Sequence, residues 1–281
     1  MIDLHTHTDC SDGTDSPAQL VNKALAEGFS VLAITDHDTT SGWHAAEQAL
    51  RPNLSLALGA EISCLTTDGI SVHMLGLLFD GTNAEMQEML ENTRDGRIPR
   101  ALKMIELLNA GGIKISMADV ESVKPIGATL GRPHIADALV KNGVVASRDE
   151  AFTDLLHNES PYYVAHLAPT PEDAISMIRR AGGVAVIAHA FASLRGKVLS
   201  ADDFLPLKNA GLNGIGVNHR DHNNEERNAL AQIARELDLV ITGASDYHGT
   251  GKLNSLGENL TDPAQWERLE SLASQRRVVT P

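Results

Sequence analysis

Two histidines separated by one residue, His5 and His7, lie in the opening segment MIDLHTHTDCSDG. In a β-strand, residues i and i+2 point to the same face, so both imidazoles would lie on one side, with Asp12 in the turn that follows. Imidazole and carboxylate groups brought together in this way are typical ligands of a divalent metal ion. Because such histidine pairs are also common without a metal, the interpretation depends on partners elsewhere in the chain.

Side chains of the same chemistry recur at the ends of other predicted strands or, for His73, within one. They are Asp36, His37, Asp38, Glu61, His73, His189, Asp246 and His248. Each alone has an ordinary explanation, such as helix capping or turn formation. The carboxyl ends of parallel strands meet at one edge of a sheet, however, and α/β enzymes place their catalytic residues there. The recurrence therefore predicts a shared metal site, with too many ligands for one ion and enough for about two or three.

The absence of thiolates from this set favours hard to borderline divalent ions. We expect Mn²⁺, with Fe²⁺, Zn²⁺ and Mg²⁺ as the alternatives.

The elements that must position these side chains alternate between strands and helices. Strands are predicted over residues 2–7, 29–38, 55–64 and 71–79, and a helix capped by Ser16 follows the first strand. From Thr170 the pattern resumes, with helices over 171–183, 202–211 and 225–238 and strands over 184–190, 212–218 and 239–246. About seven strands in such an alternation predict an α/β barrel or near-barrel.

The intervening segment contains no convincing strand pattern. Helical periodicity covers residues 84–112, with a break near Asp95 and Gly96, and shorter helices are predicted over 117–123, 132–143 and 147–157. We therefore divide the chain into a first barrel part (1–82), a helical insertion (83–165) and a second barrel part (166–281).

Composition excludes several classes of protein. The formal net charge is −14 without a basic stripe, which argues against binding of long duplex nucleic acid. No apolar run reaches the length of a membrane span, and no signal peptide precedes Asp3, so we expect a cytoplasmic protein. Cys10 and Cys64 do not make a disulfide framework and are expected to be reduced thiols.

Seven short motifs cover almost the whole chain: HTHTDCSDG, ITDHDT, GAEIS, HMLGL, GRPHIA, AHA and SDYH. In this order they resemble the motifs of the polymerase and histidinol phosphatase (PHP) family of phosphoesterases. The resemblance implies a distorted (β/α)₇ barrel with a helical insertion and a trinuclear metal centre. Within the family, the chain is most similar to small bacterial enzymes that dephosphorylate nucleoside 3′,5′-bisphosphates, whose relatives trim nucleotides from the 5′ ends of short RNAs.

The resemblance also implies a distribution of ligands among the metals. The first metal would take His5, His7, Glu61 and Asp246; the second Asp12, His37 and His248; and the third Glu61, His73 and His189. Asp36 and Asp38 would accept hydrogen bonds from ligand histidines, and Asp36 is also a candidate catalytic residue. One segment departs from the family pattern: where relatives often read GIEVYH, this chain reads GIGVNHRDHN, so that Gly216 replaces the acidic residue.

Phosphate-ester hydrolysis needs a nucleophile, charge neutralisation and a protonated leaving group. A metal-bridging hydroxide would be the nucleophile, and His134 is the candidate acid or phosphate donor. A second phosphate would bind basic residues of the insertion, which would form a lid over the barrel mouth. The candidates for this contact are Arg97, Arg100, Lys103 and Arg132, and His219 is a further candidate for substrate binding.

The predicted activity is therefore removal of the 3′-phosphate from nucleoside 3′,5′-bisphosphates, such as conversion of adenosine 3′,5′-bisphosphate to AMP and phosphate. Three alternatives remain open. The first is a 5′–3′ exonuclease that releases mononucleotides from short single-stranded RNA. The second is a metal-dependent amidohydrolase, although no lysine stands at a strand end to be carboxylated. The third is a metal-stabilised structural domain without activity.

Overall fold

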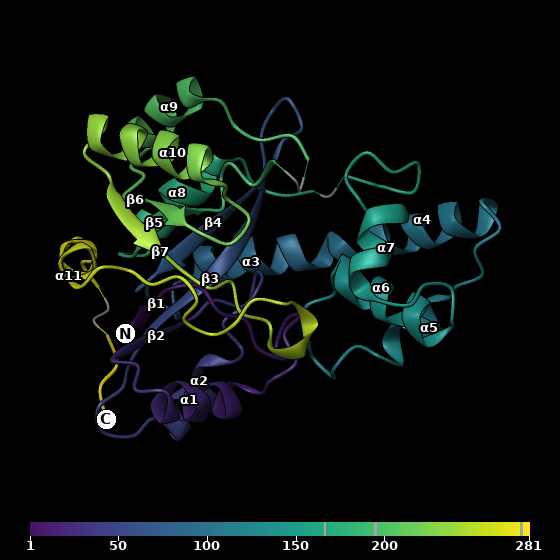
Figure 1. Cartoon of the computed structure of the whole chain (residues 1–281), viewed down its shortest axis with the longest axis horizontal. Helices are drawn as coiled ribbons and strands as arrows, with labels where there is room; N and C mark the ends of the chain where they lie inside the picture. The colour runs from purple at the N-terminus through teal and green to yellow at the C-terminus, as the bar shows by residue number, and fades with distance from the viewer. Residues whose placement is uncertain (166, 194–195, 276–277) are drawn as a thin grey trace.

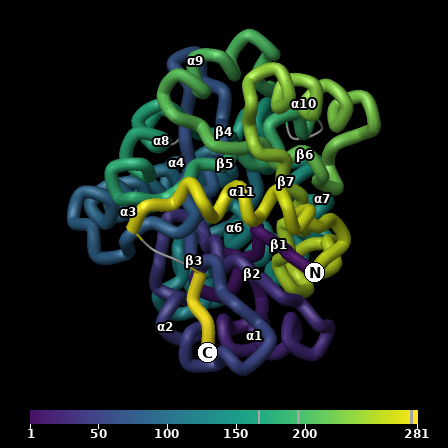
Figure 2. The backbone as a smooth tube through the Cα atoms, turned by 90° about the vertical axis from the view of Figure 1, so that its left-hand side faces the viewer, coloured from purple at the N-terminus to yellow at the C-terminus, as the bar shows by residue number. Residues whose placement is uncertain are grey.

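The computed structural model describes residues 1–165, 167–193, 196–275 and 278–281. Seven strands follow one another in a single sheet in the order of the sequence, and the sheet curls into a nearly closed barrel (Figures 1 and 2). The strands are β1 (Ile2–Asp3), β2 (Val31–Ile34), β3 (Ser55–Leu65), β4 (Ser71–Leu77), β5 (Val184–Ala188), β6 (Gly214–Asn218) and β7 (Val240–Gly243). The distorted α/β barrel expected from the sequence is confirmed.

The first strand is shorter than predicted, because β1 ends at Asp3. The segment that carries His5 and His7 follows β1, and its backbone makes irregular hydrogen bonds to the segments on both sides. Thr6 donates its N–H to the Thr35 hydroxyl (3.1 Å), and His7 donates its N–H to the Tyr247 carbonyl (2.8 Å). A threonine side chain thus replaces a backbone partner, which interrupts the regular ladder.

One strand runs against the others. β4 pairs antiparallel with both β3 and β5, and the pairing sets His73 opposite Ser63 and Ala188. The start of β4 therefore lies at the same rim as the ends of β3 and β5, so a residue early in this strand can meet residues late in the others.

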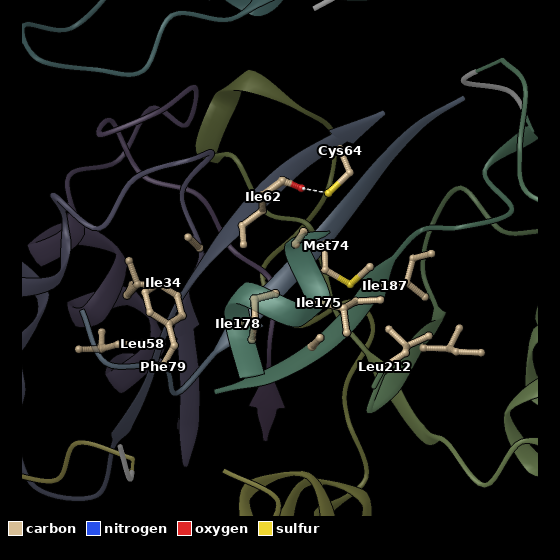
Figure 3. Packing of buried hydrophobic residues seen from close by; sticks show 14 of the residues in the cluster. Ile34, Leu58, Ile62, Cys64, Met74, Phe79, Ile175, Ile178, Ile187 and Leu212 are labelled. Carbon is tan, nitrogen blue, oxygen red and sulfur yellow. Dashed lines mark hydrogen bonds between the residues drawn. The ribbon is translucent and has the colours of Figure 1, made fainter. Parts of the chain in front are cut away.

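Helices cover the outside of the barrel. They are α1 (Pro17–Ala26), α2 (Trp43–Ala49), α8 (Pro171–Arg180), α9 (Phe204–Ala210) and α10 (Asn224–Glu236). The start of α1 is fixed as the sequence predicts, by a Ser16–Gln19 capping box with Pro17 in the first turn. Figure 3 shows Ile175 and Ile178 of α8 among buried side chains from the sheet, including Ile62 and Met74.

The end of the barrel opposite the candidate site is closed by α11 (Pro263–Ser271), which crosses the strands in Figure 2. Trp266 and Leu269 of this helix pack in a second core cluster with Ile2, Val184 and Val240, the residues at which strands begin. The barrel interior at this end is thus lined with apolar side chains.

The insertion contains α3 (Ala84–Asp95), α4 (Arg97–Ala110), α5 (Met117–Glu121), α6 (Arg132–Lys141) and α7 (Arg148–Asp154), with the predicted break at Gly96. Met86 and Leu90 of α3 pack in the barrel core, whereas α4–α7 share a hydrophobic cluster of their own. In Figure 1 these helices project to the right of the barrel. The division of the chain into parts 1–82, 83–165 and 166–281 stays a prediction.

None of the helices described here combines the length and the apolar character that a bilayer crossing requires.

Candidate metal and phosphate site

Glu61, near the middle of β3, lies at the centre of a cluster of histidines. Its carboxylate is almost completely buried, and Oε2 lies 3.1 Å from each of three histidine nitrogens. These nitrogens are His5 Nε2, His7 Nε2 and His37 Nδ1. One oxygen of Glu61 therefore faces side chains from the ends of the first two strands.

The other oxygen of Glu61 faces the opposite part of the cluster. Oε1 lies 2.8 Å from His73 Nδ1 and 3.0 Å from His189 Nε2. Because the two oxygens of one carboxylate have different histidine partners, Glu61 has the arrangement of a group that bridges two sites.

The nine side chains predicted as metal ligands all lie at this rim. Three sets have ligand atoms within 4.8 Å of one another: His5, His7, Glu61 and Asp246; His7, Asp12, His37 and His248; and His37, Glu61 and His73. His189 joins the third set through its contact with Glu61. The sets follow the division predicted from the sequence, except that His7 and His37 each face two of them.

The donor atoms are oriented as metal ligands require. Among the described residues, His37 Nδ1 and His248 Nε2 are buried without a hydrogen bond, although each lies close to a carboxylate oxygen. The nearest oxygens are Glu61 Oε2, 3.1 Å from His37 Nδ1, and Asp12 Oδ1, 3.2 Å from His248 Nε2. A nitrogen and an oxygen that approach without hydrogen-bond alignment can both face a common cation, and imidazole with carboxylate suits a divalent ion. The residues therefore fit the metal centre implied by the sequence.

Metal binding needs ionised carboxylates and neutral imidazoles. The metal-free site meets this need in part, because hydrogen bonds with Asp246 and Glu61 raise the pKa of His7 to about 10 despite its burial, so a metal ion would have to displace that proton. Burial alone would raise the pKa values of Glu61 and Asp246, but neighbouring side chains, chiefly His5 beside Glu61 and Lys252 beside Asp246, hold both pKa values well below their usual range. Burial lowers the pKa of His248 to about 4, with a further contribution from His7, and it lowers the pKa of His37 well below its usual value. The acids are thus anionic, and these two histidines are neutral near neutral pH.

Backbone strain marks the strand ends at this rim. Asp38, His189 and Asp246 have φ values of 52°, 32° and 53°, in a region that residues other than glycine adopt rarely and at a cost. Such strain occurs where the surrounding contacts fix a side chain in a particular direction, as they do here.

Asp36 does not reach the candidate site as a catalytic group. Its carboxylate is buried and accepts hydrogen bonds from Thr8 N–H (2.8 Å), Thr8 Oγ1 (2.7 Å) and Ser11 Oγ (2.6 Å). Ser11 Oγ lies 3.4 Å from His7 Nδ1, so Asp36 supports that histidine only through Ser11. Its position fixes the loop that carries Asp12.

Asp38 and Arg97 form an ion pair with each other. The sequence analysis expected Asp38 to accept from a ligand histidine and Arg97 to bind phosphate. Arg97 donates to Asp38 Oδ2 from Nε (3.0 Å) and Nη2 (2.5 Å), and to Ser63 Oγ (2.7 Å). Asp38 accepts further hydrogen bonds from Ser63 rather than from a histidine, within the described part of the chain. The guanidinium of Arg97 lines the cavity but is engaged in these contacts with Asp38 and Ser63, so a direct contact with phosphate stays a prediction.

The side chain of His134 accepts a hydrogen bond at the start of its own helix, α6. The N–H of Gly131 donates to His134 Nδ1 (3.1 Å), the side chain is buried, and burial lowers its pKa. Its neighbours Gly131, Arg132 and Pro133 line the cavity beside the candidate ligands, whereas His134 is not among the described residues that line it. The structure therefore gives it a role in holding the start of α6 and does not place it as an acid at the cavity.

That cavity encloses about 490 Å³ between the rim and the insertion. Arg100 and Arg132 both line it, and both stack on Tyr163, with Cζ atoms 5.4 and 5.3 Å from the ring centroid. Burial, together with the like charge of Arg132, lowers the pKa of Arg100 to about 9. Two cations held this close in a cavity wall favour a bound anion, which would relieve their repulsion.

Two other predicted substrate contacts lie outside the cavity wall. Lys103 is exposed on α4, and its Nζ pairs with Glu106 Oε1 at 2.8 Å. His219 is buried beside the metal cluster, where Nε2 lies 3.4 Å from Asp246 Oδ2 and Nδ1 accepts the Asp221 N–H. The structure thus does not bring Lys103 to the cavity, and it places His219 next to a predicted ligand.

Four cationic side chains that line the cavity were missed by the sequence analysis: Arg148, Lys197, Arg220 and Lys252. Lys252 Nζ lies 2.9 Å from Asp246 Oδ2, and Arg148 pairs with Asp137 while its Nη1 lies 3.3 Å from the Gly251 carbonyl oxygen. Lys252 follows the SDYH motif closely enough for that proximity to have signalled it. No local pattern points to Arg148, because its contacts depend on how α7 packs against the barrel loops.

Comparison with known proteins agrees with this geometry. The PHP domain model matches residues 3–123. The chain is 33% identical over 252 residues to a 3′,5′-nucleoside bisphosphate phosphatase of Chromobacterium violaceum, covering 89% of this chain and 88% of that protein. It is 34% identical to a 5′-3′ exoribonuclease of Haemophilus influenzae, covering 92% and 93% of the two chains. A solved structure of a putative metal-dependent phosphoesterase from Bifidobacterium adolescentis matches with a TM-score of 0.91 and 40% identity, over 97% of this chain and 96% of that one.

Proposed function

Because the chain belongs to the PHP family of metal-dependent phosphoesterases, we propose that it removes the 3′-phosphate from nucleoside 3′,5′-bisphosphates. Adenosine 3′,5′-bisphosphate is the substrate to test first. The observation that carries the proposal is a single cavity bounded both by the candidate ligands and by a pair of arginines from the insertion.

The candidate ligands support binding of two or three divalent ions, with Mn²⁺ as the expected metal. Such ions would supply an activated water and neutralise the phosphoryl oxygens. The protein's own part is to fix the donor atoms. Glu61 holds histidines on both of its oxygens, and Asp36 fixes the loop that presents Asp12.

Arg100 and Arg132 would bind the second phosphate. A guanidinium suits phosphate because its planar fork can donate two hydrogen bonds to two oxygens. Arg132 is also the first residue of α6, where backbone N–H groups favour an anion. A substrate held there by its 5′-phosphate would present its 3′-phosphate to the metal cluster.

The size of the cavity also supports a small substrate. Its volume of about 490 Å³ lies within the range of roughly 300–1,000 Å³ that is typical of small-ligand sites. A single nucleotide fits this range, and a longer chain would have to extend out of the mouth.

The test compares Arg132→Gln with the unchanged protein after loading with Mn²⁺. Phosphate release is measured from adenosine 3′,5′-bisphosphate and from 3′-AMP, which lacks the 5′-phosphate. Loss of a charged hydrogen bond, about 1.5–3 kcal/mol, should raise KM for the bisphosphate by about 10- to 100-fold. The KM for 3′-AMP should change little, and Lys103→Gln, which removes an exposed charge from α4, should change neither. Equal effects of Arg132→Gln on both substrates would contradict the proposal.

A second candidate is a 5′–3′ exoribonuclease, which the similarity to the Haemophilus influenzae protein favours. In that case a 5′-phosphorylated RNA of a few nucleotides would release mononucleotides at a rate comparable to bisphosphate hydrolysis. Separating mononucleotides from free phosphate in the same assay distinguishes the two activities.

A further inference from the structure

Lys252 occupies a position that the metal and arginine sites do not explain. It follows the 3-10 turn Gly249–Gly251, next to the loop that carries His248, and its side chain lines the cavity. The side chain is 31% exposed, so its ammonium is open to a ligand while it contacts a buried carboxylate.

That carboxylate belongs to Asp246, and its two oxygens face different partners. Oδ1 lies 3.5 Å from both His5 Nε2 and His7 Nε2, on the inner side of the cluster. Oδ2 faces Lys252 Nζ at 2.9 Å. Lys252 therefore lies on the outer side of a predicted ligand, between the metal cluster and the cavity.

We propose that Lys252 binds the phosphoryl group that is to be hydrolysed and is thus a catalytic residue of this site. The proposal rests on the proposed ligand set and on phosphoesterase activity. An ammonium carries three donors, and within the described residues Lys252 donates to Asp246 alone. When Asp246 shares its charge with a divalent ion, its attraction for Lys252 falls, and a phosphate dianion becomes the stronger partner.

The position of Lys252 also complements the arginines. Arg100 and Arg132 come from the insertion, whereas Lys252 comes from a loop of the barrel. The cavity therefore has cations on two separate walls, one beside the metal cluster, as a substrate with two phosphates requires. Cations aimed at a transferring phosphoryl group stabilise the charge that it carries in the transition state.

The test uses Lys252→Gln and Lys252→Arg, with Lys141→Gln as a control that removes an exposed lysine on α6. Binding of inorganic phosphate to the Mn²⁺-loaded protein is measured by calorimetry, and binding of Mn²⁺ to the metal-free protein is measured separately. We expect Lys252→Gln to weaken phosphate binding by about 10- to 100-fold, the loss of one charged hydrogen bond, with Mn²⁺ binding unchanged. Lys252→Arg should recover part of the loss, and the control should match the unchanged protein.

In the hydrolysis assay, Lys252→Gln should lower kcat/KM for 3′-AMP and for adenosine 3′,5′-bisphosphate by similar factors, unlike Arg132→Gln. A parallel loss of Mn²⁺ and phosphate binding would overturn the proposal, because Lys252 would then act by holding Asp246. Unchanged phosphate binding would also overturn it. If the protein shows no preference for bisphosphates, the proposed substrate is wrong, but the effect of Lys252 on inorganic phosphate is unaffected by that result.

Discussion

Arg97 and Asp38 form a buried ion pair that joins the first turn of α4 to the residue after His37. Arg97 Nε lies 3.0 Å from Asp38 Oδ2, and Arg97 also donates to the hydroxyl of Ser63, two residues beyond Glu61. The Asp38 carboxylate in turn accepts the Ser63 N–H at 2.8 Å. One ion pair thus connects the insertion to both strands that present His37 and Glu61.

Removal of one partner should leave a buried charge without compensation. We expect Arg97→Met to lower the free energy of unfolding by about 3–5 kcal/mol, as measured by urea denaturation. The matched control is Arg268→Met, which breaks an exposed ion pair with Asp238 and should cost no more than about 1 kcal/mol. An equally small effect at Arg97 would show that the pair does not anchor the insertion.

Glu61 should affect the number of bound ions more than any histidine that it contacts. Because its two oxygens face different histidines, Glu61→Gln should remove more than one equivalent of Mn²⁺ per chain. His189 Nε2 lies 3.0 Å from Oε1, so His189→Gln should remove at most one equivalent. Metal content after equilibrium dialysis, determined by elemental analysis, measures both; equal losses would mean that Glu61 does not bridge.

Asp3 should make stability depend on pH. Burial raises its pKa from 3.8 to about 6, despite hydrogen bonds from Ser245 N–H and Gly257 N–H. Well below pH 3.8 the carboxyl is protonated in both folded and unfolded chains. As the pH rises from there through 6, the unfolded chain ionises first, and stability is lost. The loss should be on the order of 3 kcal/mol by pH 7, at 1.36 kcal/mol per pKa unit.

The measurement is urea denaturation with a chelator at pH 4, 5.5 and 7, for the unchanged protein and Asp3→Asn. As the pH rises, the unchanged protein should lose stability relative to Asp3→Asn. The contributions of all other groups cancel in this difference between the two unfolding free energies. A difference that stays constant with pH would show that Asp3 has an ordinary pKa.

The order of the elements and the convergence of the ligands could be predicted from the sequence, because both depend on local signals. Ser16 and Pro17 mark a helix start through contacts within one turn. Parallel strands place their carboxyl ends at one rim whatever their exact register. The sequence alone therefore predicts that His37 and Asp246 lie close together.

The roles of the basic residues could not be predicted in the same way. Arg97 and Lys103 lie on the same helix, but one is buried against Asp38 and the other is exposed beside Glu106. Helical periodicity separates faces of a helix, but it does not identify the distant residue that meets each face. The reversed direction of β4, which brings His73 to the rim, follows from its short hairpin with β3, whereas the pairing of β4 with β5 joins residues more than a hundred positions apart and has no local signal.

The sheet has one seam, between its first and last strands, and the bonds that cross it at the rim come from the residues with metal chemistry. Asp246 donates its N–H to the His5 carbonyl (3.0 Å), and Thr6 pairs with Tyr247. An ion held by His5 and Asp246 would cross-link the two edges of the sheet at this seam. During synthesis, the site that contains His5 could therefore be completed only after the distant Asp246 had also been synthesised.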